Sequence, residues 1–174
     1  MKRLIILRGP AGSGKTTVSM ALRDKIGEND TYVLDLDVTH HDEHKFNRNL
    51  EDCLQHRNVI GEIFYGNSHT TNPTKWIVRF KDAGYNILSV ILFCNKEVCI
   101  DRCKKDNTTR RHSVNREKDT ISKYYDEFYQ REQRTPFHII AGIKGIMIET
   151  ESKSTIEVAE DILRNFTRLF PKYR

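Results

Sequence analysis

The chain has 174 residues and a formal net charge of +5, with 37% hydrophobic and 30% charged residues. This length suits one domain with a single core and is short for two, so we expect residues 1–174 to form one domain. No apolar run approaches the roughly 18 to 20 residues that cross a bilayer, and the apolar run that opens the chain leaves no room for a signal peptide. The composition therefore predicts a soluble, cytoplasmic protein without a membrane partner.

Hydrophobic spacing predicts strands that alternate with helices along most of the chain. Short apolar runs predict strands, and apolar residues that recur every three or four positions predict helices. This alternation predicts an α/β fold with a five-stranded, mainly parallel sheet and helices on both faces. In chain order, the predicted elements are strand Leu4–Leu7, helix Lys15–Ile26, strand Tyr32–Leu36, helix 42–57, strand Val59–Phe64, helix Thr74–Ala83, strand Ile87–Phe93, helix 96–105, helix Glu117–Arg134, strand Ile143–Ile148 and helix Thr155–Phe170.

The segment Asp106–Arg116 interrupts this alternation. It carries Arg110 and Arg111 together with further basic residues, and it has few apolar residues. The predicted helix Glu117–Arg134 follows it directly. We interpret residues 106–134 as a cationic helical lid over a ligand site.

A phosphate-binding pattern follows the first predicted strand. The residues G-P-A-G-S-G-K-T fit G-x-x-x-x-G-K-[ST], the P-loop. Its glycines let successive N–H groups turn toward a phosphate, and the helix that follows points its positive end at the same anion. The lysine can reach the β- and γ-phosphates, and the threonine hydroxyl can bind Mg²⁺. We therefore expect an ATP and Mg²⁺ site, with Lys15 catalytic and Thr16 also on the metal, formed by Gly9, Pro10, Ala11, Gly12, Ser13, Gly14, Lys15, Thr16 and Thr17.

Three acidic residues are predicted near the carboxyl ends of strands, where ligands bind in open α/β sheets. Asp35 and Asp37 lie at the end of the second strand, and such an acid could accept a hydroxyl proton or order water on Mg²⁺. We expect Asp37 to be the base and Asp35 to lie at the metal, although Asp37 also fits a simple helix cap. Glu62 interrupts the apolar third strand, which fits a metal-site acid, an acid at a sheet edge or an acid that is bonded locally.

Three arginines are candidates for phosphate contacts. Arg110 and Arg111 lie in the predicted lid and could clamp the transferring phosphoryl group. Arg102, on the helix before the lid, could support the nucleotide or the lid itself. An ordinary solvated surface explains the same residues, and the positive net charge suits a nucleotide or a polynucleotide partner without deciding between them.

The cysteines do not form a recognisable metal motif. Cys53, Cys94, Cys99 and Cys103 make no C-x-x-C pair and no zinc spacing. Cys99 and Cys103 are four residues apart and share one helix face, which favours core packing. Mg²⁺ that accompanies ATP is the metal that the sequence implies.

Three segments resemble the small P-loop kinases of the zeta-toxin-like and polynucleotide-kinase-like group. They are G-P-A-G-S-G-K-T-T at Gly9–Thr17, D-L-D at Asp35–Asp37 and I-L-F-C-N-K-E-V-C-I-D-R-C at Ile91–Cys103. The resemblance implies that Asp37 acts as general base toward an acceptor hydroxyl and that Arg110 or Arg111 holds the γ-phosphate. The stretch Ile63–His69 has an asparagine but lacks the aspartate of the D-x-T-N-like loop that polynucleotide kinases of this type carry.

These observations together predict an ATP-dependent kinase that transfers the γ-phosphoryl group to a hydroxyl. The acceptor is a small molecule or the 5′-hydroxyl of a polynucleotide, and we expect it near Tyr65–Pro73 and the helix 42–57. A nucleoside monophosphate kinase remains an alternative, because Arg48 and Arg57 could bind an acceptor phosphate. A slowly hydrolysing ATP-binding regulatory module is a further alternative. The sequence does not indicate an oligomeric state.

Overall fold

The computed structural model describes residues 1–35, 43–63, 73–107 and 118–171. Its five strands form one sheet in the order β2-β3-β1-β4-β5, and every neighbouring pair runs parallel. The predicted α/β fold with a five-stranded sheet is thus confirmed. The strands are β1 Lys2–Arg8, β2 Thr31–Asp35, β3 Asn58–Ile63, β4 Tyr85–Phe93 and β5 Lys144–Glu149. The helices are α1 Lys15–Ile26, α3 Glu43–Leu54, α4 Pro73–Asp82, α5 Lys96–Asn107, α6 Lys118–Arg134, α7 Phe137–Ile140 and α8 Thr155–Leu169, with a 3-10 turn η1 at Glu28–Asp30.

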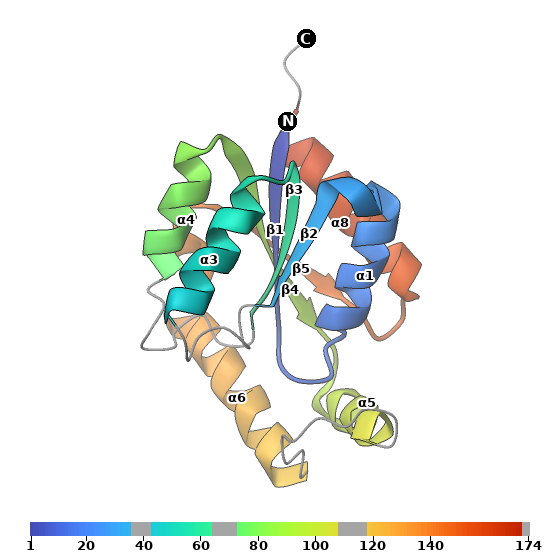
Figure 1. Cartoon of the computed structure of the whole chain (residues 1–174). Coiled ribbons are helices and arrows are strands. Elements are labelled where there is room, and N and C mark those ends of the chain that lie inside the picture. The colour runs from blue at the N-terminus through green and yellow to red at the C-terminus, as the bar shows by residue number, and fades with distance from the viewer. Residues whose placement is uncertain (36–42, 64–72, 108–117, 172–174) are drawn as a thin grey trace.

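Helices cover both faces of the sheet (Figure 1). Along β1, Leu4 and Ile6 belong to the apolar cluster that contains residues of α3 and α4, whereas Ile5 and Leu7 belong to the cluster that contains residues of α1 and α8. This alternation is the two-residue period of a strand that is buried on both faces. Helices α5 and α6 lie beyond the carboxyl ends of the strands, on the side of the sheet where β1 leads into α1 (Figure 1).

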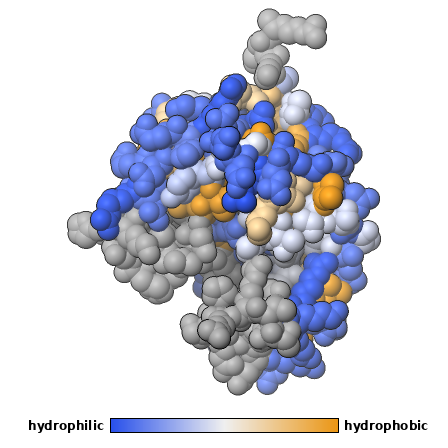
Figure 2. Space-filling view, turned by 45° about the vertical axis from the view of Figure 1, so that its right-hand side comes forward, coloured by the Kyte–Doolittle hydropathy of each residue, from blue (hydrophilic) through white to orange (hydrophobic). Residues whose placement is uncertain are grey.

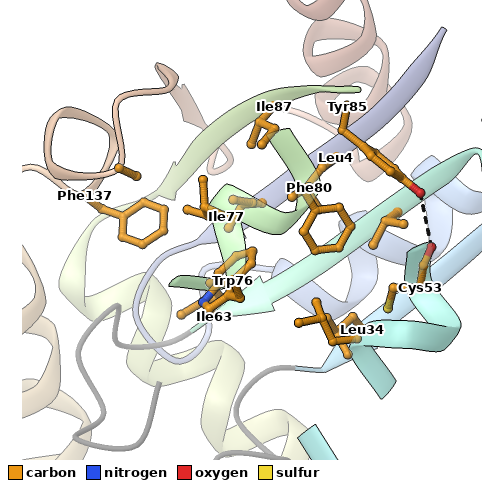
Figure 3. Close-up of a cluster of buried hydrophobic side chains, with 14 residues drawn as sticks. Leu4, Leu34, Cys53, Ile63, Trp76, Ile77, Phe80, Tyr85, Ile87 and Phe137 are labelled. Carbon is orange, nitrogen blue, oxygen red and sulfur yellow. Dashed lines mark hydrogen bonds between the residues drawn. The ribbon is translucent and has the colours of Figure 1, made fainter. Parts of the chain in front are cut away.

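The cluster under α3 and α4 is rich in aromatic residues (Figure 3). Phe80 packs edge-on against Tyr85 with ring centroids 4.9 Å apart, and Trp76 packs edge-on against Phe80 at 6.1 Å. The Tyr85 hydroxyl donates to the backbone oxygen of Cys53 at 3.3 Å, so the buried ring keeps its polar end paired (Figure 3). This packing fixes α3 and α4 against the strands that end at the candidate site.

Most predicted elements are confirmed, with shifts of a few residues at their ends. Helix α5 continues through Asp106 and Asn107, which the sequence analysis assigned to the lid. Helix α6 coincides with the predicted helix of that lid apart from its first residue. The four-residue helix α7 and the turn η1 were not predicted, because elements this short carry no readable hydrophobic period.

Exposed hydrophobic residues are scattered over the described surface. Ile139, Met147 and Ile156 are 67%, 58% and 58% exposed, and they come from three different elements. On the face shown in Figure 2, hydrophobic residues form small separate groups on a largely hydrophilic surface. Within the described ranges, no helix combines the length and the apolar character that a membrane span requires.

Candidate functional site

The loop between β1 and α1 can exist only with glycine at two of its positions. Gly9 has φ +149° and Gly12 has φ +80°. A Cβ atom on Gly9 would lie 2.5 Å from the backbone oxygen of Leu92, and one on Gly12 would lie 2.2 Å from the backbone oxygen of Cys99. The loop therefore lies directly against the carboxyl end of β4 and the first turn of α5, and its backbone conformation excludes larger residues.

Helix α1 presents an open N-terminus at the end of this loop. Its N-cap is Gly14, and no side-chain hydrogen bond caps it. Lys15 Nζ donates to the backbone oxygens of Gly9 at 2.7 Å and Pro10 at 3.1 Å. Uncapped N–H groups, the positive end of the helix dipole and an ammonium group thus lie within one turn of chain. This combination is suited to an anion such as a phosphate.

The buried carboxylate of Glu62 joins α1 to the middle of the sheet. Thr16 Oγ1 donates to Glu62 Oε2 at 2.8 Å, and Ser19 Oγ donates to Glu62 Oε1 at 2.5 Å. The residue is 8% exposed and lies on β3, between β1 and β2. Glu62 is therefore neither at a sheet edge nor bonded locally, which favours the metal-site interpretation of the sequence.

A hydroxyl and a carboxylate beside a phosphate-binding loop fit Mg²⁺, which prefers oxygen ligands and keeps several waters. Thr16 and Glu62 supply these two groups 2.8 Å apart. Asp35, the last residue of β2, pairs in register with Glu62, so the two acidic positions are adjacent at the carboxyl end of the sheet. Among the described residues, three or more histidine, cysteine or acidic residues do not gather in a metal-binding cluster.

Arg102 supports the P-loop from α5. Its Nη2 donates to the backbone oxygen of Thr150 at 2.8 Å, and its Nη1 lies 3.2 Å from Thr150 Oγ1 and 3.5 Å from the backbone oxygen of Gly12. Thr150 Oγ1 in turn lies 3.2 Å from the backbone oxygen of Ser13 and can donate to it. Arg102 on α5 and Thr150, the residue that follows β5, thus contact the loop at Gly12 and Ser13.

Two thiols complete this side of the loop. Cys94 Sγ and Cys99 Sγ are 2.9 Å apart, and all four cysteines are buried and free. The hydrogen bond from Cys99 lowers the pKa of the Cys94 thiol, and the charge of Arg102 lowers it further, whereas burial opposes both effects. The pKa of Cys99 is raised, mainly by the same hydrogen bond and by burial. The predicted role of the cysteines in packing is consistent with their burial.

The structure brings together part of the predicted set. The P-loop residues Lys15 and Thr16 are joined at the site by Glu62 and Arg102. The other predicted positions lie outside the described residues, namely Asp37, Arg110, Arg111 and most of Tyr65–Pro73. Three groups of contacts around the site were not predicted from the sequence. Ser19 could have been found as a polar residue one helical turn from Thr16, but the long-range partners Thr150 and the pair Arg8–Glu132 gave no local signal.

Comparisons with known sequences match only part of the chain. No family model matches. The genome polyprotein of feline calicivirus (strain Cat/United States/Urbana/1960) is 48% identical over 49 residues, which are 28% of this chain and 3% of that polyprotein. The genome polyprotein of canine calicivirus (strain 48) is 44% identical over 91 residues, which are 52% of this chain and 4% of that polyprotein. The matched segments are thus small parts of much longer proteins.

Comparisons with solved structures cover nearly the whole chain. Shikimate kinase from Acinetobacter baumannii is 19% identical with a TM-score of 0.58, and the match covers 99% of this chain and 97% of that chain. A gluconokinase from Sinorhizobium meliloti 1021 is 12% identical with a TM-score of 0.56, covering 96% and 93%. This chain therefore shares its fold with these two kinases. At such low identities the likeness extends to the fold alone, and it does not select the zeta-toxin-like subgroup.

Proposed function

We propose that this chain is a single-domain, ATP-dependent kinase that transfers the γ-phosphoryl group of ATP to a hydroxyl acceptor. The observation that carries the proposal is the hydrogen bond between Thr16 of the P-loop and the buried Glu62 of β3. A phosphate-binding loop alone would serve any nucleotide-binding protein. A buried carboxylate on the loop's threonine supplies the second half of a Mg²⁺–phosphate site within a kinase fold.

The P-loop and the neighbouring acidic residues have separate roles in this proposal. The N–H groups of the loop and of the first turn of α1 bind phosphate oxygens, and Lys15 moves from the carbonyl oxygens of Gly9 and Pro10 to the β- and γ-phosphates. Thr16 and Glu62 would hold Mg²⁺ and orient its waters, with the position of Asp35 next to Glu62. When bound there, the ion would supply positive charge to offset the charge that develops on the phosphate oxygens during transfer.

Acceptor activation is assigned to Asp37. It follows the end of β2 by two residues, and β2 ends beside Glu62 in the sheet register. An aspartate so close in sequence to this strand end is suited to accept the proton of an attacking hydroxyl. Arg110 and Arg111 would stabilise the transferring phosphoryl group, as the resemblance to small P-loop kinases implies, and Arg102 would hold the loop that binds the nucleotide.

The helix α6 of the proposed lid is anchored to the rest of the molecule. Tyr125 of α6 donates to the backbone oxygen of Cys94 at 2.8 Å, and Ile121 packs with Ile100 and Cys103 of α5, against which Ala11 of the P-loop also lies. We propose that residues 106–134 close over the bound nucleotide while these contacts of α6 hold the lid in place. Exclusion of water matters because water would otherwise accept the phosphoryl group.

The test is a screen with γ-labelled ATP against sugars, sugar acids, nucleosides, aminoglycosides and 5′-hydroxyl oligonucleotides. We expect the wild type to label at least one acceptor, Lys15→Ala to label none, and Asp37→Asn to bind ATP without transferring phosphate. Asp35→Asn is the matched control at the neighbouring acid. Near-normal transfer by Lys15→Ala would refute the proposal, and loss in Asp35→Asn but not in Asp37→Asn would reassign the base.

A further inference from the structure

Arg8 is a buried cation at the carboxyl end of the central strand β1, where the proposed nucleotide site lies. It is the last residue of β1, directly before Gly9, and only 3% of it is exposed. Leu4 and Ile6, four and two residues earlier, face the cluster under α3 and α4, so the strand period directs Arg8 to the same face. Glu62 belongs to the opposite face, because its carboxylate reaches α1. Arg8 thus lies beside the P-loop but across the sheet from the proposed metal site.

The guanidinium of Arg8 is held by α6 and α7. Its Nη2 pairs with Glu132 Oε1 at 2.5 Å, and the Glu132 side chain is only 10% exposed. The guanidinium carbon lies 4.2 Å from the ring centre of Phe137 and 5.6 Å from that of Phe128. Two aromatic rings and one carboxylate therefore fix the plane of the guanidinium.

Three of the five polar atoms of this buried ion pair have no hydrogen-bonding partner. Arg8 Nε and Nη1 and Glu132 Oε2 are shielded from solvent and make no hydrogen bond in the structure. Buried charges are costly unless their remaining donors and acceptors are satisfied, and well-packed apolar residues would fill the same space without that cost. A contribution to the stability of the fold therefore does not explain why an ion pair with three unpartnered polar atoms lies at the carboxyl end of β1.

The unused atoms define a complementary ligand. The charges of Arg8 and Glu132 offset each other, and together the pair offers two donor nitrogens and one carboxylate acceptor oxygen. A hydroxyl group can accept from an N–H and donate to a carboxylate, whereas a carboxylate or phosphate of the ligand would be repelled by Glu132. Two neighbouring hydroxyls match the set of atoms.

We propose that Arg8 and Glu132 bind neighbouring hydroxyl groups of the acceptor, so that the substrate class is a sugar or polyol, including the ribose of a nucleoside. This inference rests on the kinase function proposed above. The acceptor would lie next to Gly9 and thus beside the phosphate donor. Because the three atoms are shielded, the Phe128 or Phe137 side chain must move aside when the acceptor binds.

The experiment measures both binding and turnover. Saturation-transfer NMR with D-ribose, adenosine and 2′,3′-dideoxyadenosine is recorded on the protein with a non-hydrolysable ATP analogue and Mg²⁺, and initial rates are measured with ATP. We expect D-ribose or adenosine to bind the wild type and 2′,3′-dideoxyadenosine, which lacks the neighbouring hydroxyls, to bind at least about tenfold more weakly than adenosine. Glu132→Gln and Arg8→Lys should each weaken diol binding roughly tenfold or more, with the KM for ATP within about twofold of wild type.

Asp126→Asn is the matched control, because Asp126 lies on the same helix and pairs with Lys96 at 2.6 Å, away from Arg8. It should leave diol binding unchanged, and circular dichroism and melting curves confirm that each variant is folded. Unchanged diol binding in folded Glu132→Gln and Arg8→Lys would overturn the inference, as would a wild type that binds none of the diols. Tighter binding of glycolate or phosphate by Glu132→Gln than of any diol would assign the pair to an anion instead. Diol binding that depends on Arg8 and Glu132 but is not followed by phosphorylation would support a hydroxyl-binding site at this pair and count against the proposed kinase function.

Discussion

At the residue scale, the geometry around Glu62 makes the strongest link between sequence and proposed chemistry. Its two carboxylate oxygens accept from Thr16 and from Ser19, so the acid is oriented by two hydroxyls of one helix. Replacement by glutamine keeps the size and one acceptor oxygen but removes the charge. The consequences of that change should therefore concern the metal rather than the fold.

We expect Glu62→Gln to raise the Mg²⁺ concentration for half-maximal activity by about 10- to 100-fold, the range found when groups that orient a metal's ligands are removed. The measurement is a Mg²⁺ titration of phosphoryl transfer at saturating ATP. Ser19→Ala is the control, because it removes one orienting hydrogen bond and leaves the carboxylate. An unchanged Mg²⁺ requirement in Glu62→Gln would place the metal elsewhere.

A second residue-scale prediction concerns the contact between the P-loop and α5. Gly12→Ala would place a methyl group 2.2 Å from the backbone oxygen of Cys99, so the loop must shift and ATP affinity should fall at least about tenfold. Gly84→Ala is the matched control, since φ is +79° there against +80° at Gly12 and nothing lies within 4 Å of its added Cβ. Gly84→Ala should lose about 1–2 kcal/mol of stability through backbone strain, and Gly12→Ala at least as much because of the added clash. Only Gly12→Ala should change nucleotide affinity in a titration by calorimetry, and equal affinities would contradict the close approach.

At the element scale, α8 illustrates how a helix start is encoded locally. Ser154 Oγ accepts from the backbone N–H of Glu157 at 3.3 Å, and the Glu157 carboxylate accepts from the backbone N–H of Ser154 at 2.7 Å. This reciprocal capping box follows the S-x-x-E spacing. The buried face of α8 then packs Val158, Ile162 and Phe166 against the sheet.

Ser154→Ala should lower the free energy of unfolding by about 1 kcal/mol at neutral pH. Hydrogen bonds from Ser154 lower the pKa of Glu157, so the stabilisation is present above the ordinary carboxyl pKa and is lost as the pH falls through the lowered value. The difference between wild type and variant, measured by urea unfolding, should therefore shrink in acid. Thr167→Ala, which removes a hydroxyl at the other end of α8, is the control, and a difference that grew in acid would contradict the assignment.

Elements encoded by local sequence could be predicted, whereas contacts between distant segments could not. Strand β1 and helix α1 followed from a local apolar run and a local motif, and their bounds agree closely with the structure. The interpretation of Glu62 stayed open in the sequence, because its partner Thr16 lies 46 residues earlier. The pair Arg8–Glu132 could not be predicted for the same reason, because its two residues lie far apart in the sequence. In addition, the charged sequence of α6 is typical of a solvent-exposed helix.

At the scale of the whole molecule, the strand order explains why these separate segments meet. β1 is central, with β3 on one side and β4 on the other, so the P-loop at its end touches the carboxyl ends of both neighbours. Glu62 comes from β3, and the contacts of Gly9 and Gly12 come from the end of β4 and the start of α5. A parallel sheet brings all of these ends to one edge, where ligands of open α/β folds bind.

Because the ligand would join several elements at that edge, nucleotide binding should stabilise the entire fold. At a ligand concentration of 100 times Kd the gain is about 2.7 kcal/mol, which for a protein of this size raises Tm by about 5–10 °C. We expect this rise for the wild type with ATP and Mg²⁺ in differential scanning calorimetry, and little or none for Lys15→Ala at the same concentration. Thr150→Val should fall between them, because it weakens the support of the P-loop at Ser13 and Arg102 while leaving Lys15 in place. A wild-type rise that Lys15→Ala reproduces in full would mean that ATP binds away from the loop between β1 and α1.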